Sequence, residues 1–230
     1  MKLERDEEYY REICDLIDEN TWIISDTHFD HANMLKYEPI RQRMAEKNHT
    51  TIEKYMMKEW NKLVQFNETI FHLGDFAWKN ISMWAQTVAG KGILMYGNHD
   101  HGSITKYTSN SWSLIRDAVV DLDDKIHVIP ISRKQLYKTQ ANFLIKEIMG
   151  KRIMFSHLPY LDDCEYDLKF QDARQFLYSM FTSYDCELNI HGHIHGNTAN
   201  CPNCMNLSVE QTDFRPIRLH KLIKKFFKNL

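Results

Sequence analysis

The sequence predicts an α/β fold made by one domain. Short apolar, β-rich runs alternate with longer segments whose apolar residues recur every three or four positions, as in amphipathic helices. Five of the short runs end in clusters of Asp, Asn or His. The 230 residues contain no internal repeat, no low-complexity tract and no linker rich in Pro, Gly or Ser, so we expect residues 1–230 to form a single domain.

The first half of the chain predicts helices and strands in alternation. The spacing of apolar residues predicts a helix over about residues 5–19. Thr50 and Glu53 have the spacing of a capping box, so a long helix is expected to begin there. Asn80 is expected to cap a helix that runs to Val88. The predicted strands are the apolar runs at residues 21–25, 69–73 and 93–96.

The second half predicts more strand than helix. Asn142–Ile148 and Lys151–Phe155 flank Met149-Gly150, which predicts a β-hairpin. A helix is expected over residues 172–184, and residues 219–230 are expected to form a C-terminal basic helix with its lysines toward solvent. The other predicted strands lie at residues 126–129, 188–190, 206–210 and 216–219.

The composition excludes several classes of protein. The 29 Lys and Arg nearly balance 31 Asp and Glu, which argues against a protein that coats nucleic acid or anionic lipid. No apolar run is long enough to span a bilayer, so we expect no membrane partner. The N-terminal segment has acidic residues where an export signal carries its apolar core. We therefore expect a cytoplasmic protein.

The five cysteines are expected to be reduced thiols. Cys14, Cys164 and Cys186 lie apart in the sequence, whereas Cys201 and Cys204 form one CPNC motif. A single CxxC motif without a second pair indicates a structural zinc site only weakly, so we favour free thiols on a loop. A nucleic-acid-binding protein stabilised by zinc at this motif is kept as an alternative.

Five predicted strands end in side chains that bind metals or transfer protons. In chain order they are Asp26 with His28, Asp75, Asn98 with His99, His157, and His193 with His195. The carboxyl ends of parallel strands lie along one edge of an open sheet, and the loops there meet in one crevice. These residues are therefore expected to lie together although they are far apart in the sequence.

This set of side chains suits two divalent metal ions. Two carboxylates, one amide oxygen and four imidazoles favour Mn²⁺, Fe²⁺, Co²⁺, Ni²⁺ or Zn²⁺ over Ca²⁺, which prefers oxygen ligands alone. Seven ligands are too many for one such ion and suit two ions that share a carboxylate. Two divalent cations and two Asp leave a charge of about +2, which attracts a phosphate and lowers the pKa of a bridging water. We expect Mn²⁺ first, with Fe, Zn, Ni or Co as alternatives.

Each cluster taken alone also has a structural interpretation. Gly-Asp and Gly-Asn-His-Asp after a strand are usually turns, and a lone histidine such as His157 is more often structural. Three alternating histidines in residues 191–196 are harder to attribute to chance. Because a cluster of this kind occurs at five of the predicted strand ends, we favour the metal site.

These clusters resemble the signature blocks of the calcineurin-like metallophosphoesterases. The blocks are DTH (26–28), GD (74–75), GNHD (97–100), His157 and GHIH (192–195), and the resemblance runs from about residue 22 to 219. The small bacterial and phage members are more similar still, in residues 25–37, 155–160 and 208–219. Two positions depart from that subgroup: Asp30 replaces the usual Gly, and residues 37–41 replace an Arg-Pro-Phe segment.

The resemblance implies a four-layer αββα sandwich of two mixed β-sheets flanked by helices. It also implies how the ligands divide between two metals: Asp26, His28 and His195 for the first, Asn98, His157 and His193 for the second, and Asp75 for both. His99 would not bind metal. It would face the substrate and donate a proton or hydrogen bond to a phosphoryl or leaving oxygen, with Asp100 orienting it.

Together these observations predict a phosphoester hydrolase whose nucleophile is a hydroxide that bridges two metals. The signature blocks contain no Arg or Lys to grip a monoester dianion, so we expect a phosphodiester, such as a nucleotide or nucleic-acid linkage. His31, Asn33 and Arg41 are candidates for substrate binding, although His31 and Asn33 could equally cap a helix. A phosphomonoesterase of the same fold and a non-catalytic scaffold with a vestigial metal site are the alternatives.

Overall fold

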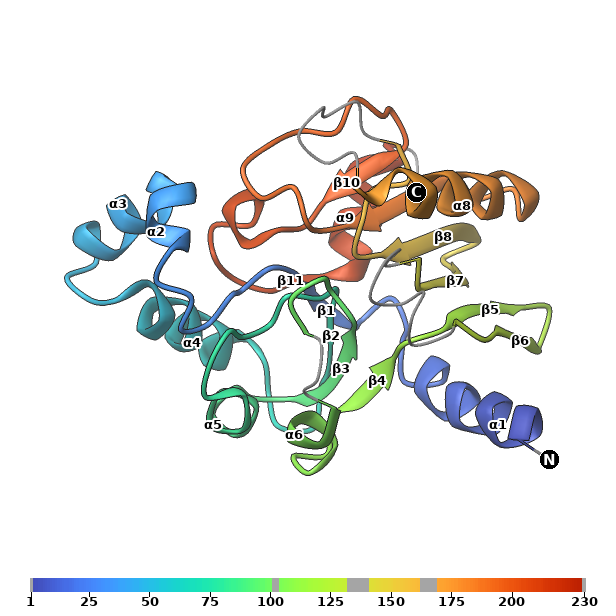
Figure 1. Ribbon diagram of the computed structural model, residues 1–230, viewed down its shortest axis with the longest axis horizontal. Coiled ribbons are helices and arrows are strands. Elements are labelled where there is room, and N and C mark those ends of the chain that lie inside the picture. Colours follow the sequence, from blue (N-terminus) through green and yellow to red (C-terminus); the bar gives the residue numbers. More distant parts are fainter. Residues whose placement is uncertain (1, 101–103, 132–140, 162–168, 229–230) are drawn as a thin grey trace.

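The structure, a computed structural model, describes residues 2–100, 104–131, 141–161 and 169–228 and contains two mixed β-sheets (Figure 1). The five-stranded sheet has the order β11-β1-β2-β3-β4, and β11 alone is antiparallel to its neighbour. Its strands are β1 (Trp22–Ile24), β2 (Thr69–His72), β3 (Lys91–Met95), β4 (Ser113–Ile115) and β11 (Ile217–Arg218).

The six-stranded sheet has the order β10-β9-β8-β7-β5-β6. Its strands are β5 (Ala118–Leu122), β6 (Lys125–Ile129), β7 (Phe143–Ile148), β8 (Lys151–Ser156), β9 (Leu188–His191) and β10 (Cys204–Asn206). β7 and β8 pair antiparallel around Met149-Gly150, which confirms the predicted hairpin. β8, β9 and β10 run parallel, so β8 and β9 end at the same edge of the sheet.

Helices cover the outer faces of both sheets, which confirms the predicted sandwich fold (Figure 1). The helices are α1 (Lys2–Cys14), α2 (Met34–Tyr37), α3 (Pro39–Lys47), α4 (Ile52–Leu63), α5 (Ile81–Thr87), α6 (Ile104–Thr108), α8 (Gln171–Ser183) and α9 (Leu219–Phe226). α4, α5 and α6 pack on the five-stranded sheet, and α8 packs on the six-stranded sheet. None of these helices is long and apolar enough to cross a membrane.

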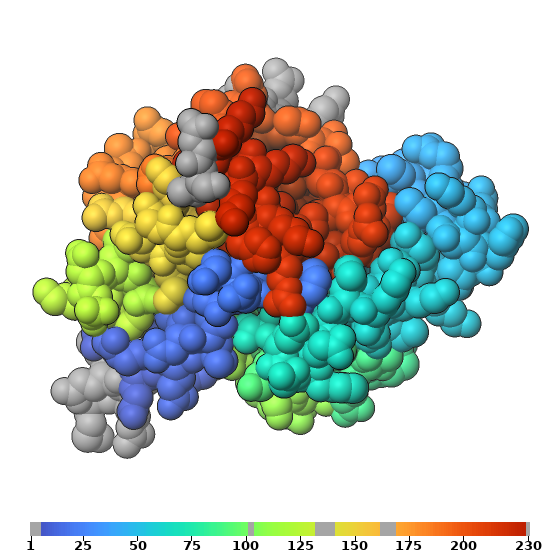
Figure 2. Space-filling model, turned by 180° about the vertical axis from the view of Figure 1, so that it is seen from behind, coloured from blue at the N-terminus to red at the C-terminus, as the bar shows by residue number. Residues whose placement is uncertain are grey.

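The core follows the alternation of side chains along each strand. In β2, Phe71 faces the six-stranded sheet while Ile70 faces the helices, and in β8 Phe155 faces Phe71 at a ring separation of 5.5 Å. α1 and α9 close one side of this inner layer. Figure 2 shows the N-terminal and C-terminal segments side by side there, where the backbone N–H of Leu219 donates to the carbonyl of Thr21.

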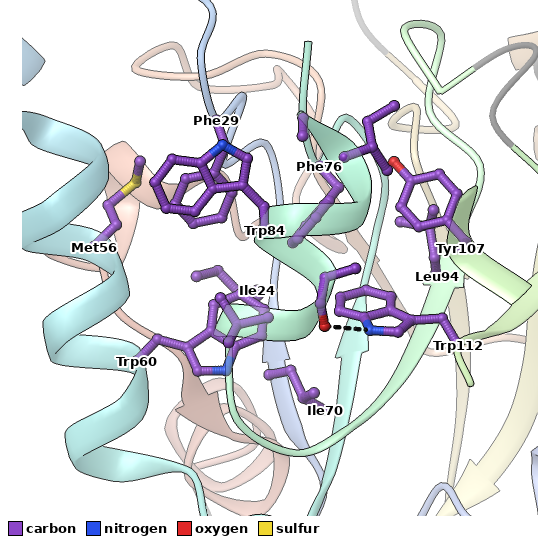
Figure 3. Packing of buried hydrophobic residues seen from close by; sticks show 14 of the residues in the cluster. Ile24, Phe29, Met56, Trp60, Ile70, Phe76, Trp84, Leu94, Tyr107 and Trp112 are labelled. Atoms are coloured by element: carbon purple, nitrogen blue, oxygen red, sulfur yellow. Dashed lines mark hydrogen bonds between the residues drawn. The ribbon is translucent and has the colours of Figure 1, made fainter. Parts of the chain in front are cut away.

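Tryptophans fill the layer between the five-stranded sheet and its helices. Figure 3 shows Trp60 of α4, Trp84 of α5 and Trp112, which precedes β4, all packed in one cluster. Trp60 and Trp112 donate their indole N–H groups to the carbonyls of Ala89 and Ala85. Each ring is both buried and hydrogen-bonded, and the bond from Trp84 to Asp30 ties α5 to the loop after β1. The layer therefore holds α4 and α5 to segments that enter and leave the sheet.

Several helix ends differ from the predictions. The Thr50–Glu53 capping box is wrong: Thr51 occupies the cap of α4, and its hydroxyl accepts from the N–H of Lys54. Asn80 stands at the cap of α5 but caps nothing, because its side chain donates to Asp30 instead.

The predicted N-terminal helix over 5–19 also has different bounds, since α1 begins at Lys2 and ends at Cys14. Asp18 and Thr21 draw backbone N–H groups into a turn beyond it. The C-terminal helix α9 begins at Leu219 as predicted and ends at Phe226.

The predicted strand over residues 206–210 is wrong for most of its length. β10 ends at Asn206, whose side chain accepts the backbone N–H of Ser208 and turns the chain. Val209–Gln211 then form a short 3₁₀ helix. This turn directs Ser208 and Glu210 inward, toward the ends of β1 and β9.

We expect Gly92→Ala to destabilise the fold through the tryptophan layer. A Cβ atom on Gly92 of β3 would stand 2.3 Å from the ring of Trp112, and that ring is held by its bond to Ala85. Overpacking of this kind costs about 1–3 kcal/mol, whereas Lys91→Ala on the exposed neighbouring position should change stability by less than about 0.5 kcal/mol. Urea denaturation followed by fluorescence compares the two variants, and equal stabilities would contradict the packing argument.

Candidate metal centre

The seven predicted ligands meet where strands of both sheets end. Asp26 and His28 follow β1, Asp75 follows β2 and Asn98 follows β3, all in the five-stranded sheet. His157 follows β8, and His193 and His195 follow β9, in the six-stranded sheet. The residue pattern alone predicted one sheet edge, whereas the structure places the site between the edges of two sheets.

Asp75 lies at the middle of the site. Its Oδ2 atom is 3.4 Å from His28 Nε2 and 3.5 Å from His157 Nε2, so one carboxylate oxygen faces imidazoles from both sheets. Its Oδ1 atom accepts the backbone N–H of His99 at 2.8 Å. Since Oδ1 is fixed and Oδ2 faces both groups of ligands, Asp75 is placed where a bridging carboxylate would have to be.

Asp26 is held in a similar way. Its Oδ2 atom accepts the backbone N–H of His193 at 2.9 Å and the hydroxyl of Ser208 at 3.0 Å. Gly192 permits this approach, because a Cβ there would stand 2.2 Å from the same oxygen. Asp26 Oδ1 and His28 Nε2 are buried and have no hydrogen-bond partner within the described residues. These two atoms lie 4.0 Å apart, so both could contact one ligand placed between them.

Two groups of these side chains have the spacing of metal ligands. Their ligand atoms lie within 4.8 Å of one another in each group: Asp26, His28 and His195 in the first, and Asp26, Asp75 and His157 in the second. The first group is the set that the resemblance assigned to one metal. Asn98 Oδ1 extends the second group, since it lies 3.0 Å from His157 Nε2.

The backbone of the site is strained. Five of the predicted ligands have left-handed backbone conformations, with φ between 48° and 71°: Asp26, His28, Asp75, His193 and His195. Such conformations cost about 1–3 kcal/mol in non-glycine residues and concentrate at functional sites. Each turns the chain sharply after a strand and directs a polar side chain inward.

His157 is a basic imidazole held against Asp75. Its Nδ1 faces the carbonyl of Leu73 at 2.9 Å, and its Nε2 faces both Asn98 and Asp75. Burial alone would lower the pKa of His157, but the Asp75 carboxylate raises this pKa to about 9. In turn, the His157 imidazole holds the pKa of Asp75 well below its usual range, although burial alone would raise this pKa. The imidazolium therefore serves as counter-ion to Asp75 when no cation is bound.

His195 is oriented by a carboxylate that the sequence analysis missed. Its Nδ1 lies 3.4 Å from Glu210 Oε2, which leaves Nε2 for a metal. Burial opposes a rise in the pKa of His195, but Glu210 raises it. Glu210 and Ser208 both lie in the segment predicted as a strand, and nothing in the sequence indicated that they turn inward.

Arg41 is not a substrate-binding residue in this structure, contrary to the prediction. Its side chain is buried, and Nε pairs with Glu210 Oε1 at 2.6 Å. Its two terminal nitrogens donate to the carbonyls of Asp26 and Thr27. Arg41 therefore supports the loop that carries Asp26 from beneath, because all of its nitrogens are bound to the protein.

Asp100 supports the loops and does not orient His99, which corrects the second catalytic prediction. Its carboxylate accepts the backbone N–H groups of Asp75, Phe76 and Gly97, and the hydroxyl of Tyr107. Burial and the nearby Asp75 raise the pKa of Asp100 to about 6. Asp100 thus ties the loop after β2 to the loop after β3.

His99 and His31 lie on the partly exposed side of the site, which we call its mouth. The His99 side chain is 37% exposed, and its Nε2 is 4.0 Å from Asp75 Oδ2. His31 Nδ1 is 3.3 Å from His28 Nδ1, so His31 contacts a candidate ligand from outside. Asn33 is exposed at the start of α2. Its side chain makes no capping hydrogen bond, so it does not have the capping role that the sequence left open for it.

The four cysteines within the described residues belong to none of the candidate metal-ligand groups. Cys201 and Cys204 pack in the apolar layer beneath α8, and no group of three metal-binding side chains in the described ranges includes either. Cys14 and Cys186 are buried free thiols. Cys164 lies outside the described residues.

Similar proteins share the fold of this chain. No family model matches the sequence. The uncharacterized protein MJ1445 of Methanocaldococcus jannaschii is 24% identical over 215 residues, which cover 88% of this chain and 89% of that protein. The crystal structure of AQ665, a protein of unknown function from Aquifex aeolicus, is similar with a TM-score of 0.66 and 26% identity, and the match covers 89% of this chain and 98% of that one. The sandwich is thus shared with an experimentally determined structure.

We expect Mn²⁺ to bind more tightly as the pH rises toward about 9. Below that pH the metal-free His157 carries a proton, so a metal ion that binds Nε2 must displace it. Competition with this one proton should make the apparent affinity for Mn²⁺ rise about tenfold for each unit of increase in pH. Calorimetric titrations in buffers of different ionisation enthalpy measure the affinity and the protons released. An affinity that is constant between about pH 6.5 and 8.5 would show that His157 does not bind the ion.

Proposed function

We propose that this protein is a phosphoester hydrolase that uses two divalent metal ions and prefers phosphodiesters to phosphomonoesters. The observation that carries the proposal is the convergence of seven metal-binding side chains from both sheets, with Asp26 Oδ1 and His28 Nε2 buried and unsatisfied among the described residues. The resemblance of the same residues to the calcineurin-like metallophosphoesterases supports this activity.

The proposed ligands divide between the two ions as the resemblance implies: Asp26, His28 and His195 for one, Asn98, His157 and His193 for the other, and Asp75 for both. Bound there, the ions would supply positive charge for the phosphoryl oxygens and an activated water for in-line attack. Mixed nitrogen and oxygen donors suit Mn²⁺ and its neighbours in the first transition row. The chain's own contribution is orientation, since Leu73, Glu210 and Ser208 fix the ligands that they contact.

His99 is the proposed acid of the reaction. It belongs to neither group of candidate ligands, and its partly exposed ring faces the mouth of the site. The bond from its backbone N–H to Asp75 Oδ1 fixes the start of its side chain. From this position His99 would donate a proton or hydrogen bond to the phosphoryl or leaving oxygen.

The preference for a phosphodiester follows from charge. Two divalent ions and the carboxylates of Asp26 and Asp75 leave about +2, which suffices for a diester monoanion. A monoester dianion is commonly gripped by additional Arg or Lys. The structure assigns Arg41 to other partners, and Lys36, the other basic candidate, is exposed on α2.

We expect Asp75→Asn to lose metal and activity together, because Asp75 would be the carboxylate shared by both ions. Chelator should silence the unmodified protein, and Mn²⁺ should restore it. Elemental analysis and hydrolysis of bis(4-nitrophenyl) phosphate measure the two effects. Full activity in a chelator-treated, metal-free sample would overturn the two-metal proposal. Two bound ions without hydrolysis of any phosphoester would favour a scaffold.

We expect His99→Ala to keep both ions and to lower kcat by about 10²–10⁴, the usual contribution of a positioned acid or base. Its fold should be unchanged because the His99 side chain is partly exposed. Elemental analysis of the variant is the control. Loss of one metal equivalent would show that His99 is a ligand.

We expect a higher kcat/KM for bis(4-nitrophenyl) phosphate than for 4-nitrophenyl phosphate, measured with Mn²⁺ at one pH. The reason is that no Arg or Lys among the described site residues is available to neutralise the second charge of the monoester. A clear preference for the monoester would reverse the substrate assignment and leave the metal ligands as they are.

A further inference from the structure

Trp78 is unusual among the tryptophans of this protein. The other four, Trp22, Trp60, Trp84 and Trp112, are between 0% and 7% exposed, and each donates its indole N–H to a partner within the protein. Trp78 is 47% exposed. Its ring does not join the apolar layer beneath it, although it follows directly on Phe76 and Ala77, which do.

The neighbours of Trp78 are histidines of the candidate metal centre. His31 stacks on its ring, with the ring centroids 4.3 Å apart and the planes within 8° of parallel. His99 lies 5.2 Å from the Trp78 ring and 5.9 Å from that of His31. These three separations keep His99 away from the Trp78 face opposite His31. Because His31 covers one face of the ring and Trp78 is 47% exposed, the exposed part of the indole lies beside His99, whose Nε2 is 4.0 Å from Asp75 Oδ2.

The segment that carries Trp78 is firmly held. The backbone N–H of Trp78 donates to the carbonyl of Phe29 at 2.8 Å. The Asp30 carboxylate accepts the side chains of Asn80 and Trp84, both at 2.8 Å. Asp30 is one of the two places where the sequence departs from the small phosphoesterases that it resembles. Its two bonds tie the residues that follow Trp78 to the loop that bears His28, and the Trp78 N–H itself is bound to Phe29, so Trp78 has a defined place at the site.

We propose that Trp78, backed by His31, is a stacking surface for a nucleobase on the phosphoester substrate. This inference rests on the proposed function, because the phosphoryl group would bind at Asp75 and His99 while the base lies on Trp78. Stacking suits this position because a half-exposed indole gains apolar contact and a planar ring matches its face. Base stacking on an aromatic side chain is tolerant of sequence, so the surface would select nucleotides over other phosphoesters without choosing one base.

Calorimetric titration of the Mn²⁺-treated protein with adenosine 5′-monophosphate and with ribose 5-phosphate tests the proposal, since ribose 5-phosphate has a hydroxyl where adenosine 5′-monophosphate carries its base. The first should bind about 5- to 150-fold more tightly, the range expected for one stacked base. Trp78→Ala should remove this difference, and Trp78→Phe should keep most of it. Phe66→Ala is the matched control, because Phe66 is 86% exposed and takes no part in the site.

Tryptophan fluorescence gives a second readout that does not depend on catalysis. Adenosine 5′-monophosphate should quench the emission of the unmodified protein and leave that of Trp78→Phe unchanged. Equal affinity for the two ligands, or a preference that survives in Trp78→Ala, would overturn the stacking surface. Hydrolysis of bis(4-nitrophenyl) phosphate, measured in parallel, separates the two proposals: activity without base preference refutes the surface alone, and base preference without activity refutes the hydrolase alone.

Discussion

The carboxylate of Asp75 is the group on which the two sheets depend for their common site. This carboxylate is buried between His28 of one sheet and His157 of the other. The backbone N–H and the Oδ1 atom of Asp75 are both hydrogen-bonded to residues of the loop after β3. Burying a carboxylate costs several kcal/mol unless positive charge accompanies it. The proton on His157 answers this need in the metal-free protein. The basic imidazole of His157 is therefore the group that accompanies the buried Asp75 carboxylate in this structure.

Holding these groups together requires a rigid surround. The left-handed turns after β1, β2 and β9 are unfavourable in isolation and persist because packing over-determines them. The tryptophan layer anchors the loops of the five-stranded sheet, and Arg41 binds the carbonyls of Asp26 and Thr27 from below. Asp100 joins the loop after β2 to the loop after β3, because its carboxylate accepts backbone N–H groups from both. Arg41 and Asp100 thus hold the loops of the site in position, and their polar atoms are already bound to the protein.

The convergence of the seven candidate ligands was predictable because each member follows an apolar run, and strand ends converge whatever the details of the sheets. The nearness of His99 to Asp75 follows from the same rule, because His99 follows β3. The roles of Arg41 and Asp100 were not predictable, because charge and position in the sequence do not reveal whether a side chain points outward or beneath a loop. Glu210 was missed for a related reason: its partner Arg41 lies 169 residues away, and its segment was taken as a strand.

The bonds from Ser208 and Glu210 also mean that the site is completed late in translation. Asp26 leaves the ribosome 182 residues before Ser208, an interval of about 10–40 s at ordinary rates of synthesis. Through that interval the acidic loop after β1 has no hydroxyl to restrain it, and the Arg41 guanidinium lacks its carboxylate partner. The nascent chain therefore carries an unfinished site until residue 210 emerges. A truncation shortly before residue 208 would keep all seven candidate ligands but remove the two side chains that hold Asp26 and His195 in place.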